Sequence, residues 1–360
     1  MPIKTDELRT KVVDIMPSAA EVTAAFPLSE HTAEHIIASR RAVEAILHGQ
    51  DNRLLVVIGP CSIHDTNAGL DYAKRLKSMA DKHKDSLLIV MRTYFEKPRT
   101  VVGWKGLIND PRLDGSCNLR EGLFVGRKFL QEVNALGMPT ATEFLDMITG
   151  QYIADLVTWG AIGARTTESQ IHREMASGMS CPIGFKNGTN GNVRIAIDAI
   201  RSSQTSHLFC GPDKEGNMTI YRTAGNPYGH VILRGGIRTN YDSKSVNAAV
   251  ANLNASNLSP HLIVDFSHAN CHKNHKLQLE VAEDVCQQLL NGERGIVGVM
   301  AESFITEGNQ VVDKDHIDNL VYGQSITDPC IGWEDTEFLL QRLADTIAIR
   351  NSKAASNNEL

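Results

Sequence analysis

From residue 53 onward, short apolar runs rich in β-branched residues alternate with longer stretches of helical periodicity. A short continuous apolar run is typical of a strand that is buried on both faces, as in a parallel sheet. Repetition of such a strand and a helix along one chain predicts a (β/α)8 barrel. The expected strands are Leu54–Ile58, Leu88–Met91, Pro139–Ala141, Ala161–Ala164, Pro182–Phe185, Val231–Leu233, Leu262–Phe266 and Ile296–Met300.

The stretches between most of these strands place apolar residues three or four positions apart, which predicts amphipathic helices. A last helix is expected after the final strand and closes the barrel. The expected helices are Ala68–Lys82, Gly122–Leu136, Gln151–Trp159, Val193–Ser203, Val246–Asn254, Lys276–Asn291 and Glu334–Arg350.

Three segments lie outside this rhythm. Residues 1–50 read as an N-terminal arm followed by a helix from Ser29, and we expect a subunit-contact and regulatory element rather than part of the barrel core. The barrel itself spans residues 51–350. Within it, residues 206–229 contain two short apolar runs around a turn-rich segment, which predicts an inserted β-hairpin. Residues 351–360 form a polar tail.

Composition narrows the class of protein. The 360 residues carry a net charge of −6, which argues against nucleic acid or an anionic membrane as the main partner. The seven cysteines show no paired spacing, and this scattering fits a reducing compartment. We find no signal-peptide pattern and no apolar run long enough to span a membrane, so a cytoplasmic location is expected.

Polar residues occupy the ends of all the expected strands. In a (β/α)8 barrel the active site lies at the carboxyl ends of the strands, so residues from distant parts of the sequence meet there. A structural rim would carry several apolar or small residues, and this set carries none. The residues at or just beyond the strand ends are Cys61, Arg92, Glu143, Arg165, Lys186, Arg234, His268 and Glu302.

Six cations in this region predict the binding of more than one anionic group. They are Arg92, Lys97, Arg99, Arg165, Lys186 and Arg234. The alternative is that each cation pairs with a buried carboxylate. Only Glu143 and Glu302 are evident as such partners in the sequence.

A second group of strand-end residues offers metal ligands: Cys61, His268 and Glu302, with Asp328 from a later loop. This mixture of soft and hard donors suits Mn, Fe, Co or Zn. Singly, each residue has a structural explanation, such as a core thiol or a loop cap. A Cys–His nucleophile pair is a rival interpretation, but the surrounding cations suit acyl transfer poorly. Other histidines could replace His268, namely His230, His272 and His275.

Several long motifs resemble those of class I 3-deoxy-D-arabino-heptulosonate 7-phosphate (DAHP) synthases. The resemblance extends from about residue 5 to about residue 350, and it is strongest to the short microbial enzymes regulated by feedback, in particular the tryptophan-sensitive isoenzyme. The motifs that carry it are Ile58–Asp65, Phe95–Thr100, Gly103–Leu107, Gly163–Gln170, Gly184–Gly188 and Asp265–Asn270.

The resemblance implies condensation of phosphoenolpyruvate with D-erythrose 4-phosphate, with release of phosphate, as the first step of the shikimate pathway. It implies that Arg165, Arg234 and the Ala164 backbone hold the phosphoenolpyruvate phosphate, and that Arg92 and Lys186 hold its carboxylate. Arg99 and Thr100 would bind the aldose phosphate, and Lys97 would lie between the substrates. Cys61, His268, Glu302 and Asp328 match the metal ligands of the family, with manganese favoured. Glu143 and a metal-bound water are the candidates for activating the attacking water.

The resemblance also implies feedback inhibition by an aromatic amino acid and assembly into a homodimer or homotetramer. Gly150 stands where phenylalanine-sensitive relatives carry Pro, and Gly211 where they carry Ser, which argues against phenylalanine. The segments Thr140–Gln151 and Thr219–Tyr221 most resemble the tryptophan-sensitive enzymes, whereas Gly211 resembles the tyrosine-sensitive ones, so tryptophan is favoured and tyrosine is second. The expected effector residues are Met147, Gly150, Gln151, Ser180, Phe209, Gly211 and Tyr221, with Asp6 and Glu7 from the arm of a neighbouring subunit.

Two other functions remain open at this point. One is a sister enzyme with the same fold that condenses phosphoenolpyruvate with arabinose 5-phosphate. The other is a catalytically silent phosphosugar sensor, although all four metal-ligand positions are filled. The roles of Trp104 and Lys105 are left unassigned.

Overall fold

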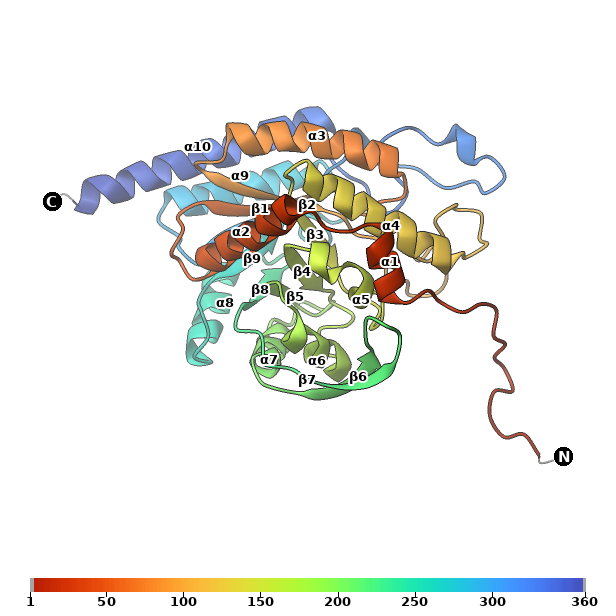
Figure 1. Cartoon of the computed structure of the whole chain (residues 1–360). Helices are drawn as coiled ribbons and strands as arrows, with labels where there is room; N and C mark the ends of the chain where they lie inside the picture. Colours follow the sequence, from red (N-terminus) through yellow and green to blue (C-terminus); the bar gives the residue numbers. More distant parts are fainter. Residues whose placement is uncertain (1–2, 359–360) are drawn as a thin grey trace.

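The computed structural model describes residues 3–358, with side chains up to residue 353. Eight parallel strands form a closed barrel in the order β1-β10-β9-β8-β5-β4-β3-β2 (Figure 1). The predicted (β/α)8 fold is therefore confirmed. The strands are β1 (Leu54–Gly59), β2 (Leu87–Arg92), β3 (Thr140–Glu143), β4 (Trp159–Ile162), β5 (Ile183–Lys186), β8 (Gly229–Leu233), β9 (Leu262–Asp265) and β10 (Ile296–Glu302).

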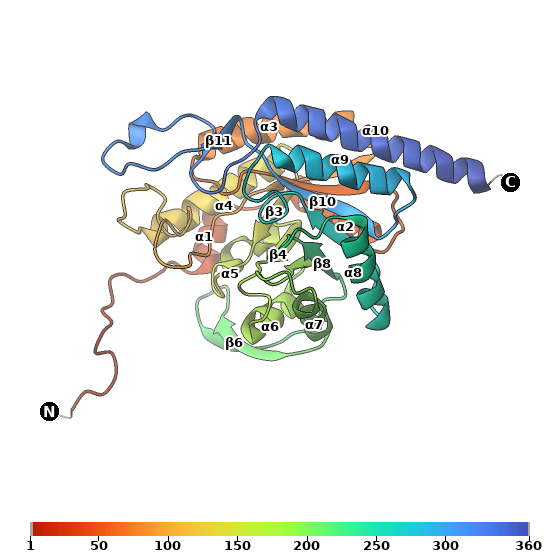
Figure 2. The same cartoon turned by 180° about the vertical axis from the view of Figure 1, so that it is seen from behind.

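Helices surround this barrel, and α9 and α10 lie side by side on it in both views (Figures 1 and 2). Helices α3, α4 and α8 begin with a side-chain cap: the Asp65 side chain, for example, accepts hydrogen bonds from two backbone N–H groups of the first turn of α3. The helices are α3 (Thr66–Lys82), α4 (Leu119–Ala135), α5 (Gly150–Ile153), η1 (Ala154–Leu156), α6 (Gln170–Gly178), α7 (Arg194–Ser203), α8 (Ser243–Ala255), α9 (Leu277–Leu290) and α10 (Trp333–Asn358).

The prediction for Gln151–Trp159 was wrong. Only the short α5 and η1 form there, and Trp159 begins β4 with its side chain fully buried in the barrel. The β-branched pair Val157-Thr158 explains the early change to extended backbone, because such residues favour strands over helices. Helix α6 was not expected at all.

Two small sheets lie outside the barrel. The predicted hairpin is present as β6 (Leu208–Pro212) paired antiparallel with β7 (Met218–Arg222). A second pair, β11 (Thr306–Asn309) and β12 (Gln324–Ser325), was not predicted, nor was the 3-10 turn η2 (Ile317–Asn319) between its strands.

The N-terminal segment consists of an exposed arm followed by two helices that pack on the barrel. The arm, residues 3–16, is exposed and extends away from the body of the protein (Figure 1). Helices α1 (Ala19–Ala25) and α2 (Glu30–Leu47) follow, each with a serine N-cap. The last turns of α2 place Val43, Ile46 and Leu47 in one buried cluster with the inward side chains of the barrel. Contrary to expectation, α2 thus belongs to the core, because it covers the apolar amino-terminal end of the barrel.

No helix within residues 3–358 has the length and hydrophobicity that crossing a membrane requires.

Candidate active site

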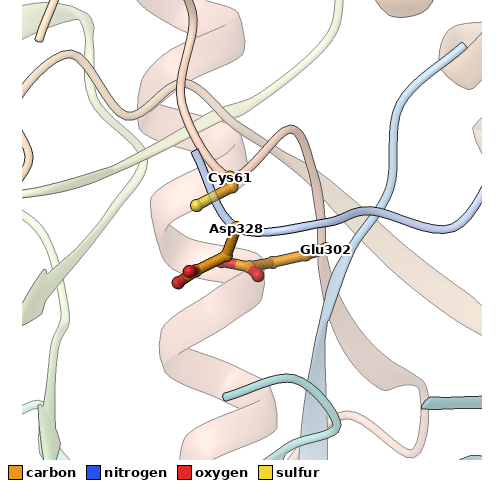
Figure 3. Close-up of side chains that lie close together, drawn as sticks. All are labelled: Cys61, Glu302 and Asp328. Atoms are coloured by element: carbon orange, nitrogen blue, oxygen red, sulfur yellow. The ribbon is translucent and has the colours of Figure 1, made fainter. Parts of the chain in front are cut away.

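Three of the four predicted metal ligands come together at the carboxyl end of the barrel. The thiol of Cys61 and carboxylate oxygens of Glu302 and Asp328 all lie within 4.8 Å of one another (Figure 3). Strand pairing explains part of this arrangement: Gly59, two residues before Cys61, is the register partner of Glu302. Asp328 arrives from the loop that precedes α10.

His268, the fourth predicted ligand, lies beside this cluster. Its Nε2 atom is 3.8 Å from an oxygen of Glu302, and its Nδ1 atom is 2.8 Å from an oxygen of Asp265. Burial alone would raise the pKa of Asp265, but the imidazole of His268 and the hydroxyl of Ser267 hold that pKa far below its usual range. A carboxylate behind a histidine fixes the ring orientation in many metal sites.

The residues present fit a divalent transition metal. A thiol, an imidazole nitrogen and two carboxylates face one small, largely buried volume, as the predicted donor set requires. Burial and the charge of Glu302 raise the pKa of Cys61, while the ammonium group of Lys97 opposes that rise. Lys97 Nζ donates a hydrogen bond to the Cys61 sulfur over 3.1 Å.

Two of the predicted cations are buried and each faces one carboxylate. Arg92 is fully buried, and its Nη2 atom lies 3.1 Å from Glu302. Lys186 Nζ lies 3.2 Å from Glu143. Burial alone would raise the pKa of Glu143, but the charges of Lys186 and Lys97 together lower that pKa. The structural ion pairs considered as the alternative are therefore present for these two residues, although Lys186 also lines the cavity at the mouth of the barrel.

Arg99, Arg165 and Arg234 are different. They line a cavity of about 280 Å³ at the mouth, together with Lys97, Thr100 and Ala164. Among the described residues, no carboxylate lies within 4.0 Å of the three guanidinium groups. Arg165 donates to the Thr100 hydroxyl over 3.3 Å. Three arginines without a carboxylate partner can bind the oxygens of incoming phosphate groups.

A second and larger cavity, of about 730 Å³, lies beside the hairpin. It brings together six of the residues predicted for the effector: Met147, Gly150, Gln151, Ser180, Phe209 and Tyr221. The rings of Phe209 and Tyr221 stack with their centroids 5.3 Å apart. Gly211 lies outside the lining, and Asp6 and Glu7 lie on the exposed arm. Side chains of α2, among them Ile36 and Ile37, complete the wall.

A family model for the "DAHP synthetase I family" matches residues 26–341. The chain belongs to this family. The Trp-sensitive phospho-2-dehydro-3-deoxyheptonate aldolase of Salmonella typhimurium is 60% identical over 347 residues, which cover 96% of this chain and 99% of that protein. The enzyme of the same name from Escherichia coli K12 is 59% identical with the same coverage. The predicted resemblance to tryptophan-sensitive DAHP synthases is confirmed.

Solved structures agree with this assignment. The phospho-2-dehydro-3-deoxyheptonate aldolase of Francisella tularensis superimposes with a TM-score of 0.92 at 45% identity, and the match covers 95% of this chain and 99% of that one. The enzyme of the same name from Thermotoga maritima has a TM-score of 0.55 at 16% identity, over 82% and 69% of the two chains, and supports the fold alone.

Within this family member, the structure adds residues that sequence reasoning missed. Lys273 and Thr327 also line the mouth, and Asp265 supports His268. Asp265 could have been found from the sequence, because it is the last residue of a buried strand. Trp104 and Lys105 shape the substrate loop through their backbone: the Trp104 carbonyl accepts from Arg99 Nε over 2.7 Å, and the Lys105 carbonyl accepts from the N–H of Lys97 over 2.8 Å.

Glu96 links the mouth to the second cavity. It precedes Lys97, and its buried carboxyl accepts a hydrogen bond from the hydroxyl of Thr149 over 2.9 Å. Thr149 directly precedes Gly150, which lines the second cavity. Burial raises the pKa of Glu96 to about 7, although the hydrogen bond from Thr149 works in the opposite direction.

Proposed function

We propose that the protein catalyses the metal-dependent condensation of phosphoenolpyruvate, D-erythrose 4-phosphate and water to DAHP and phosphate. One observation carries the proposal: the three arginines that lack a carboxylate partner among the described residues line the same mouth as His268 and Asp328. Asp328 in turn belongs to the metal-ligand cluster with Cys61 and Glu302. The substrates bring two phosphates and one carboxylate, which are the groups that such arginines bind.

In this proposal each group of residues has one task. Arg165, Arg234 and the Ala164 backbone hold the phosphoenolpyruvate phosphate, while Arg92 and Lys186 hold its carboxylate. Arg99 and Thr100 hold the aldose phosphate. Lys97 lies between the two substrates, beside Cys61. Holding both substrates in one mouth lowers the barrier through proximity, by up to roughly 7–11 kcal/mol in favourable cases.

Cys61, His268, Glu302 and Asp328 would hold the metal, with manganese favoured. A bound metal would supply Lewis acidity that polarises the aldehyde of the aldose. C3 of phosphoenolpyruvate then attacks the aldehyde carbon, water adds at C2, and phosphate leaves. Glu143 is positioned to accept a proton from that water, because its carboxylate lines the mouth.

A phosphate-release assay with both substrates tests this function. We expect turnover that requires both compounds and is lost after chelation and restored by Mn²⁺. Turnover with arabinose 5-phosphate but not with erythrose 4-phosphate would identify the sister activity instead. Tight binding of both substrates without any release of phosphate would identify a silent sensor.

We further propose that tryptophan inhibits the enzyme by binding in the second cavity, and that the chain forms a homodimer or homotetramer. The exposed arm supports the assembly, because its side chains Ile3, Val12, Val13 and Ile15 are between 77% and 93% exposed. Apolar residues at this density are typical of a surface that another chain covers. We also propose a cytoplasmic location, since all seven cysteines are free thiols.

A further inference from the structure

The ring of Tyr94 lies beside three of the predicted cations. It follows β2 by two residues, and its side chain is 1% exposed. The centroid of its ring is 3.9 Å from the guanidinium carbon of Arg92. The ammonium nitrogens of Lys97 and Lys186 lie 5.9 Å and 5.7 Å from the same centroid. Three cations that are proposed to touch the substrates therefore meet over one aromatic ring.

This arrangement has a clear electrostatic reason. Cations brought together in a buried site repel one another, and the negative face of an aromatic ring attracts a cation within about 6 Å of its centroid. Arg92 and Lys186 each have a carboxylate partner, whereas the hydrogen bonds of the Lys97 ammonium group to described residues go to the sulfur and the carbonyl oxygen of Cys61. The ring is thus the one group that all three cations share among the described residues.

The hydroxyl of Tyr94 does not explain the position of the ring. It is buried, and it makes no hydrogen bond with any residue that the structure describes. The effects of the hydroxyl and of the ring face can therefore be tested separately, because a phenylalanine at this position would keep the ring and remove the hydroxyl.

We propose that Tyr94 is a positioning residue for the condensation, and that its ring holds Arg92, Lys97 and Lys186 at the spacing that receives the phosphoenolpyruvate carboxylate. This inference rests on the proposed assignment of these cations to the substrates. It extends the substrate-binding set by an aromatic residue that touches neither substrate.

A series of fluorinated rings tests the proposal. Tyr94 is replaced by phenylalanine and then by 4-fluoro-, 3,5-difluoro- and 3,4,5-trifluorophenylalanine, which keep the ring shape and progressively weaken its negative face. We expect Tyr94→Phe to leave the KM for phosphoenolpyruvate within about twofold. Along the series that KM should rise stepwise by about tenfold in total, while kcat changes by less than about twofold. A merely structural role would not follow the number of fluorine atoms.

The same series at Phe95 is the matched control, because the ring of Phe95 packs edge-to-face against Phe129 at 6.0 Å in the same segment. Fluorination there should leave the KM unchanged. A constant or falling KM across the Tyr94 series, with normal wild-type turnover, would overturn the inference. So would a tenfold rise in Tyr94→Phe itself, which would assign the effect to the hydroxyl. Absence of turnover in the wild-type protein would instead contradict the proposed function.

Discussion

The ammonium nitrogen of Lys97 lies 3.1 Å from the sulfur of Cys61. The same nitrogen donates to the carbonyl oxygen of Cys61 over 3.2 Å, so two hydrogen bonds join the cation to this residue. Lys97, which is proposed to bind substrate, is therefore hydrogen-bonded directly to Cys61, which is proposed to bind the metal. A change in the metal site should therefore alter the binding of the substrate.

Replacing Cys61 with alanine should abolish metal-dependent turnover while the fold persists. Removing a second-sphere partner of a metal already weakens metal sites by about 10–100-fold, so loss of a direct ligand should cost at least about a hundredfold in metal affinity. Elemental analysis after gel filtration and phosphate-release kinetics measure the two effects. Cys286→Ala, at a buried thiol in α9, is the control and should keep both properties. Normal metal content in Cys61→Ala would refute the ligand assignment.

Arg165→Ala should weaken phosphoenolpyruvate binding. Arg165 is exposed at the mouth rather than buried, so the expected loss is that of an accessible charged hydrogen-bond donor, about 2 kcal/mol or about thirtyfold in Kd. Isothermal titration with phosphoenolpyruvate measures the Kd. Arg201→Ala, at an exposed position of α7, should leave the Kd unchanged. An unchanged Kd in the Arg165 variant would remove this residue from the site.

Gly150→Ala should relieve inhibition by tryptophan and spare catalysis. A Cβ atom at Gly150 would lie 3.3 Å from the terminal carbon of Met179, in the wall of the second cavity. The added methyl group would also take space from the effector, and overpacking of the occupied cavity typically costs 1–3 kcal/mol, so the inhibitory concentration should rise by about tenfold. Gly211→Ala is the matched control, because its Cβ would make only an ordinary 3.7 Å contact with Phe209. Equal inhibition of Gly150→Ala and the wild type would place the effector elsewhere.

The protein should lose stability in acid through His230. The Nε2 atom of this buried histidine accepts a hydrogen bond from the Trp159 indole over 3.0 Å, so this nitrogen carries no proton. Burial lowers the pKa of His230 to about 4. The unfolded chain binds a proton near pH 6.5, so stability is complete above that pH and declines as the pH falls toward 4, by about 3 kcal/mol.

Urea unfolding between pH 4 and 7 measures this decline. His230→Gln should reduce the slope by the amount assigned to His230, while His31→Gln, at an exposed position of α2, should not change it. An unaltered slope in His230→Gln would show that other groups cause the loss in acid.

The sequence alone was sufficient to predict the barrel fold and to identify which end of the barrel carries the candidate active site. Buried parallel strands appear as continuous apolar runs, and in a (β/α)8 barrel the active-site residues lie at the carboxyl ends of those strands. For this reason Cys61, His268 and Glu302 could be grouped without any spacing motif. The expected start of β4 was late because the helical reading of the preceding segment extended through Trp159, which proved to be an inward-facing residue of the barrel.

Other features depend on tertiary contacts that no local pattern records. Helix α6 spans only nine residues, which is shorter than the window of about 11–18 residues over which helical periodicity is recognised in a sequence. The sequence also does not reveal that Arg92 and Lys186 are buried and paired with carboxylates. Nor does it reveal that Arg99 and Arg165 are exposed. That difference arises from depth in the barrel, which is a property of the assembled fold. The ring of Tyr94 beneath the cations escaped notice for the same reason.

The position of α2 also determines how the protein can be shortened. A version starting at residue 51, the boundary that the sequence pattern favours, would lack Val43, Ile46 and Leu47 and would leave the apolar end of the barrel open to water. Pro17 already belongs to the body, since its carbonyl accepts a hydrogen bond from the hydroxyl of Tyr152 over 2.7 Å. A shortened version that keeps the barrel end covered must therefore retain α2, and one that also keeps the contact with Tyr152 begins near Pro17.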